Sequence, residues 1–228
     1  MSKGKRLRNQ RTTAPPPPVG KKRPADRRLW RGGAAVAVLV AVGIAVAAIG
    51  SGGGGAKPVH VNFGAMSGLQ NGAPPWNNGV GELQQRLGDV HLDPLAQEAL
   101  AFHIHQHVDI FVNGKHVTVP ALIGIDDSSF ITEMHTHDAS GVVHVESPTR
   151  DVFTLGQFFD VWGVRLTQSC LGGECGGGSA GVRVYVDGHL AHGDPRTIEL
   201  VSHQQIAVVF GPERRSEIPS SYTFGFGL

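Results

Sequence analysis

Cysteine is nearly absent from this sequence: only Cys170 and Cys175 occur among its 228 residues. The pair lacks the Cys-x-x-Cys spacing that favours redox pairs and thiolate metal sites. In a chain that leaves the cytoplasm, as argued below, two cysteines this close predict a disulfide that pins the surrounding glycine-rich loop. The sequence also lacks a Ser-His-Asp motif, a phosphate-binding glycine loop and a nucleotide fingerprint, so it gives no basis for these chemistries.

Acidic residues are almost missing from residues 1–31. This segment carries eleven Lys and Arg against a single acid, Asp26, and the rest of the chain carries an excess of nine acids. A basic tail can indicate nucleic-acid binding. Because this tail directly precedes an apolar run, membrane topology explains its charge better. We predict no nucleic-acid partner. With few apolar residues to bury and four consecutive prolines, residues 1–31 are predicted to be disordered.

A long apolar run without charge occupies residues 32–50, GGAAVAVLVAVGIAVAAIG. As a helix it would span ~28 Å, close to the ~30 Å hydrocarbon core of a bilayer. The arginines on its N-terminal side place the tail in the cytoplasm and the rest outside. We therefore predict a single-pass signal-anchor in the cell membrane, a glycine-rich linker at 51–57 and an extracytoplasmic domain. The alternative is export with cleavage after Ala47.

A run of alternating histidines dominates the stretch LAFHIHQHVDIFVNGKHVTVP. Asn113-Gly114 separates two alternating apolar runs, which predicts a hairpin with a type I′ turn. Because side chains alternate along a strand, the histidines share one face and the apolar residues point the other way, into a core. The histidines of this strand are His103, His105 and His107.

Further elements are predicted from alternation and capping signals. Strands are predicted at 59–63, 130–137, 142–147, 182–186 and 206–210, and helices at 95–100 and 154–163. The order hairpin, helix and further strands resembles the β-grasp, or ubiquitin-like, fold over about 130–211. The resemblance implies a mixed sheet whose last strand is central.

The predicted fold class is thus a single N-terminal transmembrane helix plus a β-rich α+β extracytoplasmic domain. Within that domain, residues 58–129 form an N-terminal part with the histidine hairpin, 130–211 the β-grasp-like part and 212–228 a C-terminal tail. No C-terminal Gly-Gly is present, so a role as a conjugated modifier is not implied.

Six of the twelve histidines fall into two clusters that are candidate metal ligands. They are His103, His105, His107, His135, His137 and His144. Neutral imidazole suits Zn²⁺ and Cu²⁺, and side chains at i and i+2 of a strand lie roughly 6.6 Å apart, close enough to share one ion. A single site would therefore use two adjacent histidines of the first cluster, with His135 or His137 from a neighbouring strand. A strand-borne His-x-His completed from a neighbouring strand resembles the zinc site of the α-type carbonic anhydrases.

The turn between the strands at 130–137 and 142–147 decides how many ligands converge. A two-residue turn places His135 opposite His144, whereas a three-residue loop with a bulge at Gly141 turns His144 to the other face. Asp138 is expected to hydrogen-bond its own backbone in this turn. Glu146 is either a base or an exposed strand carboxylate.

Three functions remain open at this point. The first is a membrane-anchored extracytoplasmic protein that binds Zn or Cu. The second is a metal-dependent hydrolase or hydratase, with water at an open coordination position and Glu146 or Asp138 assisting. The third is a non-catalytic β-grasp interaction module whose histidine face contacts a partner at the cell surface. A polar surface with imidazoles bonded to carboxylates such as Asp109 would fit the third.

Overall fold

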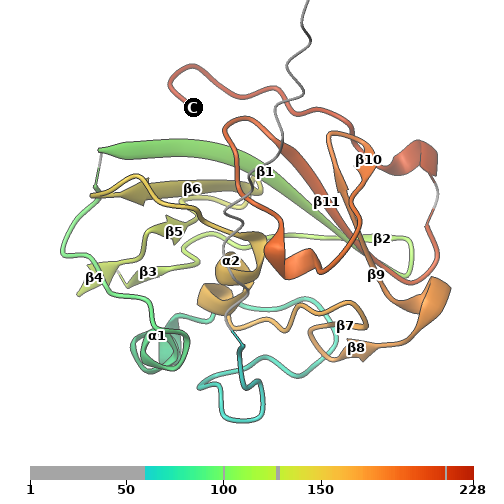
Figure 1. Cartoon of the computed structure of the whole chain (residues 1–228), viewed down its shortest axis with the longest axis horizontal. Coiled ribbons are helices and arrows are strands. Elements are labelled where there is room, and N and C mark those ends of the chain that lie inside the picture. Colours follow the sequence, from blue (N-terminus) through green and yellow to red (C-terminus); the bar gives the residue numbers. More distant parts are fainter. Residues whose placement is uncertain (1–59, 100, 127–128, 214) are drawn as a thin grey trace, which may run out of the picture. The chain divides into compact units, whose positions relative to one another are not determined.

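A computed structural model describes residues 60–99, 101–126, 129–213 and 215–228 (Figure 1). They form a mixed α/β domain that consists mostly of sheet. The tail, span and linker predicted over residues 1–57 lie outside the described ranges. Within these ranges, no helix has the length and apolar character needed to cross a membrane.

The main sheet has seven strands, and they come from both predicted parts of the domain. They are β1 (Phe102–Val112), β2 (Lys115–Val117), β5 (Met134–His135), β6 (Val142–Ser147), β9 (Val182–Val186), β10 (His189–Leu190) and β11 (Gln205–Phe210). Their order is β10-β9-β11-β1-β6-β5, with β2 paired to β1 beside this path. The central pair, β1 and β11, is parallel, and β6 and β9 flank it as antiparallel neighbours.

Smaller elements surround the main sheet. They are α1 (Leu83–Val90), α2 (Leu155–Trp162), the strand pair β3 (Ile125–Asp126) and β4 (Phe130–Ile131), the pair β7 (Cys170–Leu171) and β8 (Glu174–Cys175), and 3-10 turns at Val80–Glu82, Gly178–Ala180, Pro195–Thr197 and Arg215–Glu217. The sulfur atoms of Cys170 and Cys175 lie 2.11 Å apart, at disulfide distance, and join β7 to β8.

The predicted histidine hairpin is confirmed. Asn113 and Gly114 adopt φ values of 51° and 74°, as the two central residues of a type I′ turn require, and Val112 pairs with Lys115 across it. Because successive side chains of a strand point to opposite faces, the apolar side chains of β1 point toward the core. The opposite face of β1 carries its histidines.

Helix α2 covers the apolar face of the sheet. It begins at a capping box, in which Thr154 and Gln157 satisfy each other's backbone N–H groups, and ends at Gly163 with φ 76°. Phe158, Phe159 and Trp162 are fully buried in the core between the helix and the sheet. The predicted helix at 154–163 is therefore confirmed.

Two predicted elements are wrong, and a third is divided. Residues 95–99 are not helical, because the backbone of Leu95 exchanges hydrogen bonds of 2.8 and 3.0 Å with that of Ile131. A helix of six residues forms too few hydrogen bonds to offset its nucleation cost, so the strand-like bridge to Ile131 forms instead. Residues 60–63 form no strand, and the single strand predicted over 130–137 is divided into β4 and β5.

The C-terminal tail covers part of the sheet face that carries the histidines. The ring of Tyr222 stacks on His107 with centroids 3.8 Å apart, and Phe224 lies 4.8 Å from the ring of His203. In Figure 1 this tail, drawn in red, lies across the sheet from α2. One face of the sheet is thus covered by α2. The other face carries the histidines and is covered in part by the C-terminal tail.

Candidate metal centre

The position of His144 is fixed by backbone pairing. Strand β6 lies between β1 and β5, and His144 is directly opposite His105 on one side and His135 on the other. This is the first of the two predicted registers, so His144 shares a face with the histidines of β1. Three adjacent strands therefore bring imidazoles together on the face opposite α2.

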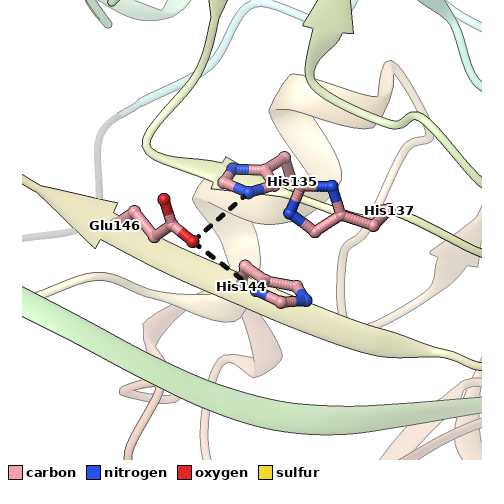
Figure 2. Close-up of side chains that lie close together, drawn as sticks. All are labelled: His135, His137, His144 and Glu146. Atoms are coloured by element: carbon pink, nitrogen blue, oxygen red, sulfur yellow. Dashed lines mark ion pairs between the residues drawn. The ribbon is translucent and has the colours of Figure 1, made fainter. Parts of the chain in front are cut away.

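An inner group of four side chains converges at this point (Figure 2). His135, His137, His144 and Glu146 each offer one ligand atom, and these atoms lie within 4.8 Å of one another. The ring of His144 is 5.4 Å from that of His135 and 4.5 Å from that of His137, measured between centroids. Ligands bound at ~2.0–2.2 Å to a tetrahedral ion lie ~3–4 Å apart, so small side-chain rotations complete such a site.

The deepest imidazole of the inner group, His135, is held in an orientation that suits a metal ligand. His135 is 0% exposed and Glu146 is 2% exposed. The Nδ1–H of His135 donates to the carbonyl of Thr132 at 2.9 Å, which leaves the lone pair on Nε2. An imidazole oriented by a backbone carbonyl in this way is the usual arrangement behind a metal ligand.

Buried polar atoms of the inner group have no hydrogen-bond partner among the described residues. They are Nε2 of His135, Nδ1 of His144 and Oε2 of Glu146. The two nitrogens lie 3.8 and 3.6 Å from the other carboxylate oxygen, Oε1, along the dashed lines of Figure 2. Native proteins rarely leave such atoms unsatisfied, and their convergence points to a shared ligand.

Burial sets the charge state of the group. It lowers the pKa of His135 to about 4 and that of His144 to about 3, with a smaller contribution from neighbouring histidines. Burial, followed by the charge of Glu98, raises the pKa of Glu146. At neutral pH both imidazoles are therefore uncharged. Because the Nδ1–H of His135 donates to Thr132, its Nε2 contact with the carboxylate brings two lone pairs together. Either a proton or a cation between them relieves that repulsion.

An outer group shares His144 with the inner one. It consists of His103, His105 and His144, again with one ligand atom from each within 4.8 Å of the others. His105 is 6% exposed, its Nε2 has no described partner, and burial lowers its pKa to about 4. The side chain of His103 is 34% exposed, and its Nε2 lies 3.1 Å from Oε1 of Glu146.

His107 belongs to neither group. Its Nδ1 lies 2.9 Å from the side-chain oxygen of Gln205, and its Nε2 lies 2.7 Å from the carbonyl of Ser140. Both ring nitrogens thus face oxygen acceptors, and Tyr222 stacks on the ring. His107 lies on the predicted face of β1. Its contacts with Ser140 and Tyr222 connect the strand to the turn before β6 and to the C-terminal tail.

Two carboxylates near the site differ from their sequence interpretation. Glu146, for which an exposed position was one alternative, is buried. Glu98 was not predicted to approach the site, yet its Oε1 lies 3.6 Å from Nε2 of His137. No sequence signal marks this contact, because the bridge at Leu95 brings the segment there. Asp138 accepts a hydrogen bond from the backbone of Ser140, as predicted.

Comparisons of the chain with family models, with curated proteins and with solved structures return no match. The chemistry of the site is therefore argued from its own geometry.

Proposed function

We propose that the protein binds one divalent transition-metal ion through His135, His137, His144 and Glu146. The observation that carries the proposal is the convergence of unpartnered, buried ligand atoms on one point. Three imidazoles and one carboxylate provide four donors, the number that Zn²⁺ takes in a tetrahedral site.

Zn²⁺ is the first candidate and Cu²⁺ the second. Imidazole suits both ions, whereas Mg²⁺ and Ca²⁺ prefer sites made of oxygen ligands alone. The ligand set contains no thiolate or thioether, which would have favoured Cu⁺. The single carboxylate partly neutralises the ion. The low pKa values of His135 and His144 mean that no proton has to leave these rings before they bind at pH 7.

The framework and location of this site belong to the same proposal. The order β6-β1-β11-β9-β10, with a parallel central pair and α2 on one face, supports a β-grasp-like framework. Here β1 takes the place of the first strand. Membrane anchorage through residues 32–50, and a site outside the cytoplasm, are supported by the charge and apolar pattern of the sequence.

Metal-assisted hydrolysis or hydration is a second candidate. It is favoured by the exposure of His137, whose side chain is 43% exposed, so that solvent reaches the edge of the group. An ion held by three of the four donors would carry a water molecule in its open position. Ester hydrolysis and CO₂ hydration by the zinc-loaded chain, abolished on metal removal, would support this candidate.

The metal content of the full chain tests the proposal. The chain is purified in detergent without a histidine tag, and zinc and copper are measured by mass spectrometry. His135→Asn is the informative variant, because the amide of Asn can still donate to Thr132 but offers no counterpart of Nε2. His189→Asn, on the exposed edge strand β10, is the matched control.

We expect about one ion per chain in the wild type and in the control, since one set of four donors fills one tetrahedral site. We expect none in His135→Asn. A folded wild type that contains no metal and binds neither Zn²⁺ nor Cu²⁺ would contradict the proposal and favour the non-catalytic interaction module.

A further inference from the structure

Each histidine group has one exposed histidine, His137 on the β5 side of β6 and His103 on the β1 side. In the inner group, His135 and Glu146 are almost completely buried. In the outer group, His103 reaches solvent while His105 is buried. His144, between them on β6, is the one residue that both groups contain. On the β1 side, the outer group therefore lies between solvent and the buried pair His135 and Glu146, whereas His137 forms the solvent-facing edge of the inner group on the other side.

The unpartnered Nε2 of His105 is not explained by the inner group. This nitrogen is buried, and His105 packs edge-on against His144 with ring centroids 4.5 Å apart. On its other side, the ring of His103 lies 4.4 Å away. A ring nitrogen that is buried among imidazoles, without a hydrogen-bond partner, is as suitable for an ion as those of the inner group.

Charge argues against two ions at once. Glu146 supplies the only carboxylate in the two groups, and the remaining donors are imidazoles. Two divalent ions on a shared imidazole would repel each other four times as strongly as two unit charges at that distance. One negative charge offsets little of this repulsion, so the two groups fit alternative positions of a single ion.

We propose that His103, His105 and His144 form an outer site through which a divalent metal ion reaches and leaves the inner site. The proposal rests on the proposed function, because it needs an ion in the inner group. The ion keeps His144 as a ligand throughout the transfer. It exchanges His103 and His105 for His135, His137 and Glu146.

The contact between His103 and Glu146 gives this exchange a physical path. Oε1 of Glu146 lies 3.1 Å from Nε2 of His103 and 3.6 Å from Nδ1 of His144. When His103 turns to take an ion from solvent, it releases this oxygen, which then faces the incoming charge. The exchange changes metal–ligand contacts only. Because the ligands are replaced one after another, the ion always keeps some of them inside the protein.

Uptake and release kinetics test the outer site. The ligand-free full chain in detergent is mixed rapidly with Co²⁺, whose visible absorption reports binding to nitrogen ligands, and release is followed after adding excess chelator. The variants are His105→Asn and His103→Asn, with His189→Asn as the matched control. His103 is exposed, so its replacement keeps the test valid if the buried variant at 105 fails to fold.

We expect the wild type to bind one Co²⁺. Each outer-site variant should slow uptake and release by a similar factor of about ten or more, because both processes lose the same intermediate position. The equilibrium affinity should then stay nearly unchanged. The control should match the wild type in both rates.

Three results would overturn the outer site. They are unchanged rates in both variants, simultaneous binding of two ions by the wild type, and a loss of affinity that arises only from faster release. The last would make His103 and His105 ordinary ligands of a single site. A wild type that binds no Co²⁺, Zn²⁺ or Cu²⁺ would instead refute the proposed function, so the two failures are distinguishable.

Discussion

Replacing Glu146 with Gln should affect the ligand-free and metal-bound protein in opposite directions. The amide keeps the shape of the carboxyl group, and its N–H can donate to the unpartnered nitrogen of His135 or of His144. The ligand-free variant should therefore be more stable than the wild type. The metal-bound variant should lose this advantage, because the only charged ligand is gone.

The expected magnitudes follow from the contacts. One hydrogen bond gained by a buried, unsatisfied nitrogen is worth about 1 kcal/mol, or about 2–4 °C in Tm for a domain of this size. In the wild type, metal at 100 times its Kd adds about 2.7 kcal/mol to the free energy of unfolding. If the Glu146→Gln substitution weakens binding about 100-fold, the same metal concentration adds about 0.4 kcal/mol.

Thermal unfolding with and without Zn²⁺ measures both effects on the full chain. Tryptophan emission is a suitable signal because Trp76 and Trp162 pack against each other in the core. Glu199→Gln removes an exposed carboxylate far along the chain and serves as the control. A Glu146→Gln variant that gains as much stability from Zn²⁺ as the wild type would refute a ligand role for this carboxylate.

Three further predictions test other parts of the structure. The pKa of His135 is about 4 in the folded protein, against 6.5 for an unperturbed histidine. The free energy of unfolding of the ligand-free protein should therefore fall by about 3 kcal/mol through this residue as pH falls from 6.5 to 4. Denaturant titrations of the wild type and of His135→Asn across that range check this. Arg196→Ala should cost about 3–5 kcal/mol in urea unfolding, because it strands the buried carboxylate of Asp160, whereas replacing both residues with apolar ones should cost less. Thr154→Ala should cost about 1 kcal/mol in the same assay through loss of the α2 cap, with Thr154→Ser nearly neutral.

Local patterns predicted the elements whose signals are contained within a few residues. The Asn113-Gly114 turn and the alternation of β1 needed no distant partner to be recognised. The capping box at Thr154 and the glycine at the end of α2 are likewise local. These signals also predicted correctly that the histidines of β1 share one face.

Distant pairing determined what the local patterns missed. Leu95 lies in a segment with a good helix start, but its backbone pairs with Ile131. That pairing carries Glu98 to His137, so the second carboxylate near the site could not be predicted from its own neighbourhood. The register that puts His144 between His105 and His135 was one of two alternatives until the strand order was known.

Burial also separated residues that look alike in the sequence. His103, His105 and His107 have equivalent positions in the His-x-His pattern. In the folded protein, His107 is held by Gln205 and by the ring of Tyr222, from segments far along the chain. Glu146, at i+2 from His144 on the same strand face, becomes buried beside His135. Spacing predicted the shared face, and only the tertiary packing divided it into distinct sites.

X-ray absorption at the metal edge of the purified full chain tests the central claim most directly. We expect one ion per chain, surrounded by about four nitrogen or oxygen ligands at ~2.0–2.2 Å, with the multiple-scattering pattern of three imidazoles. His135→Asn should lose the ion, and His189→Asn should keep it. A chain without metal, or an ion that the His135→Asn variant retains with an unchanged ligand shell, would contradict the proposed metal site.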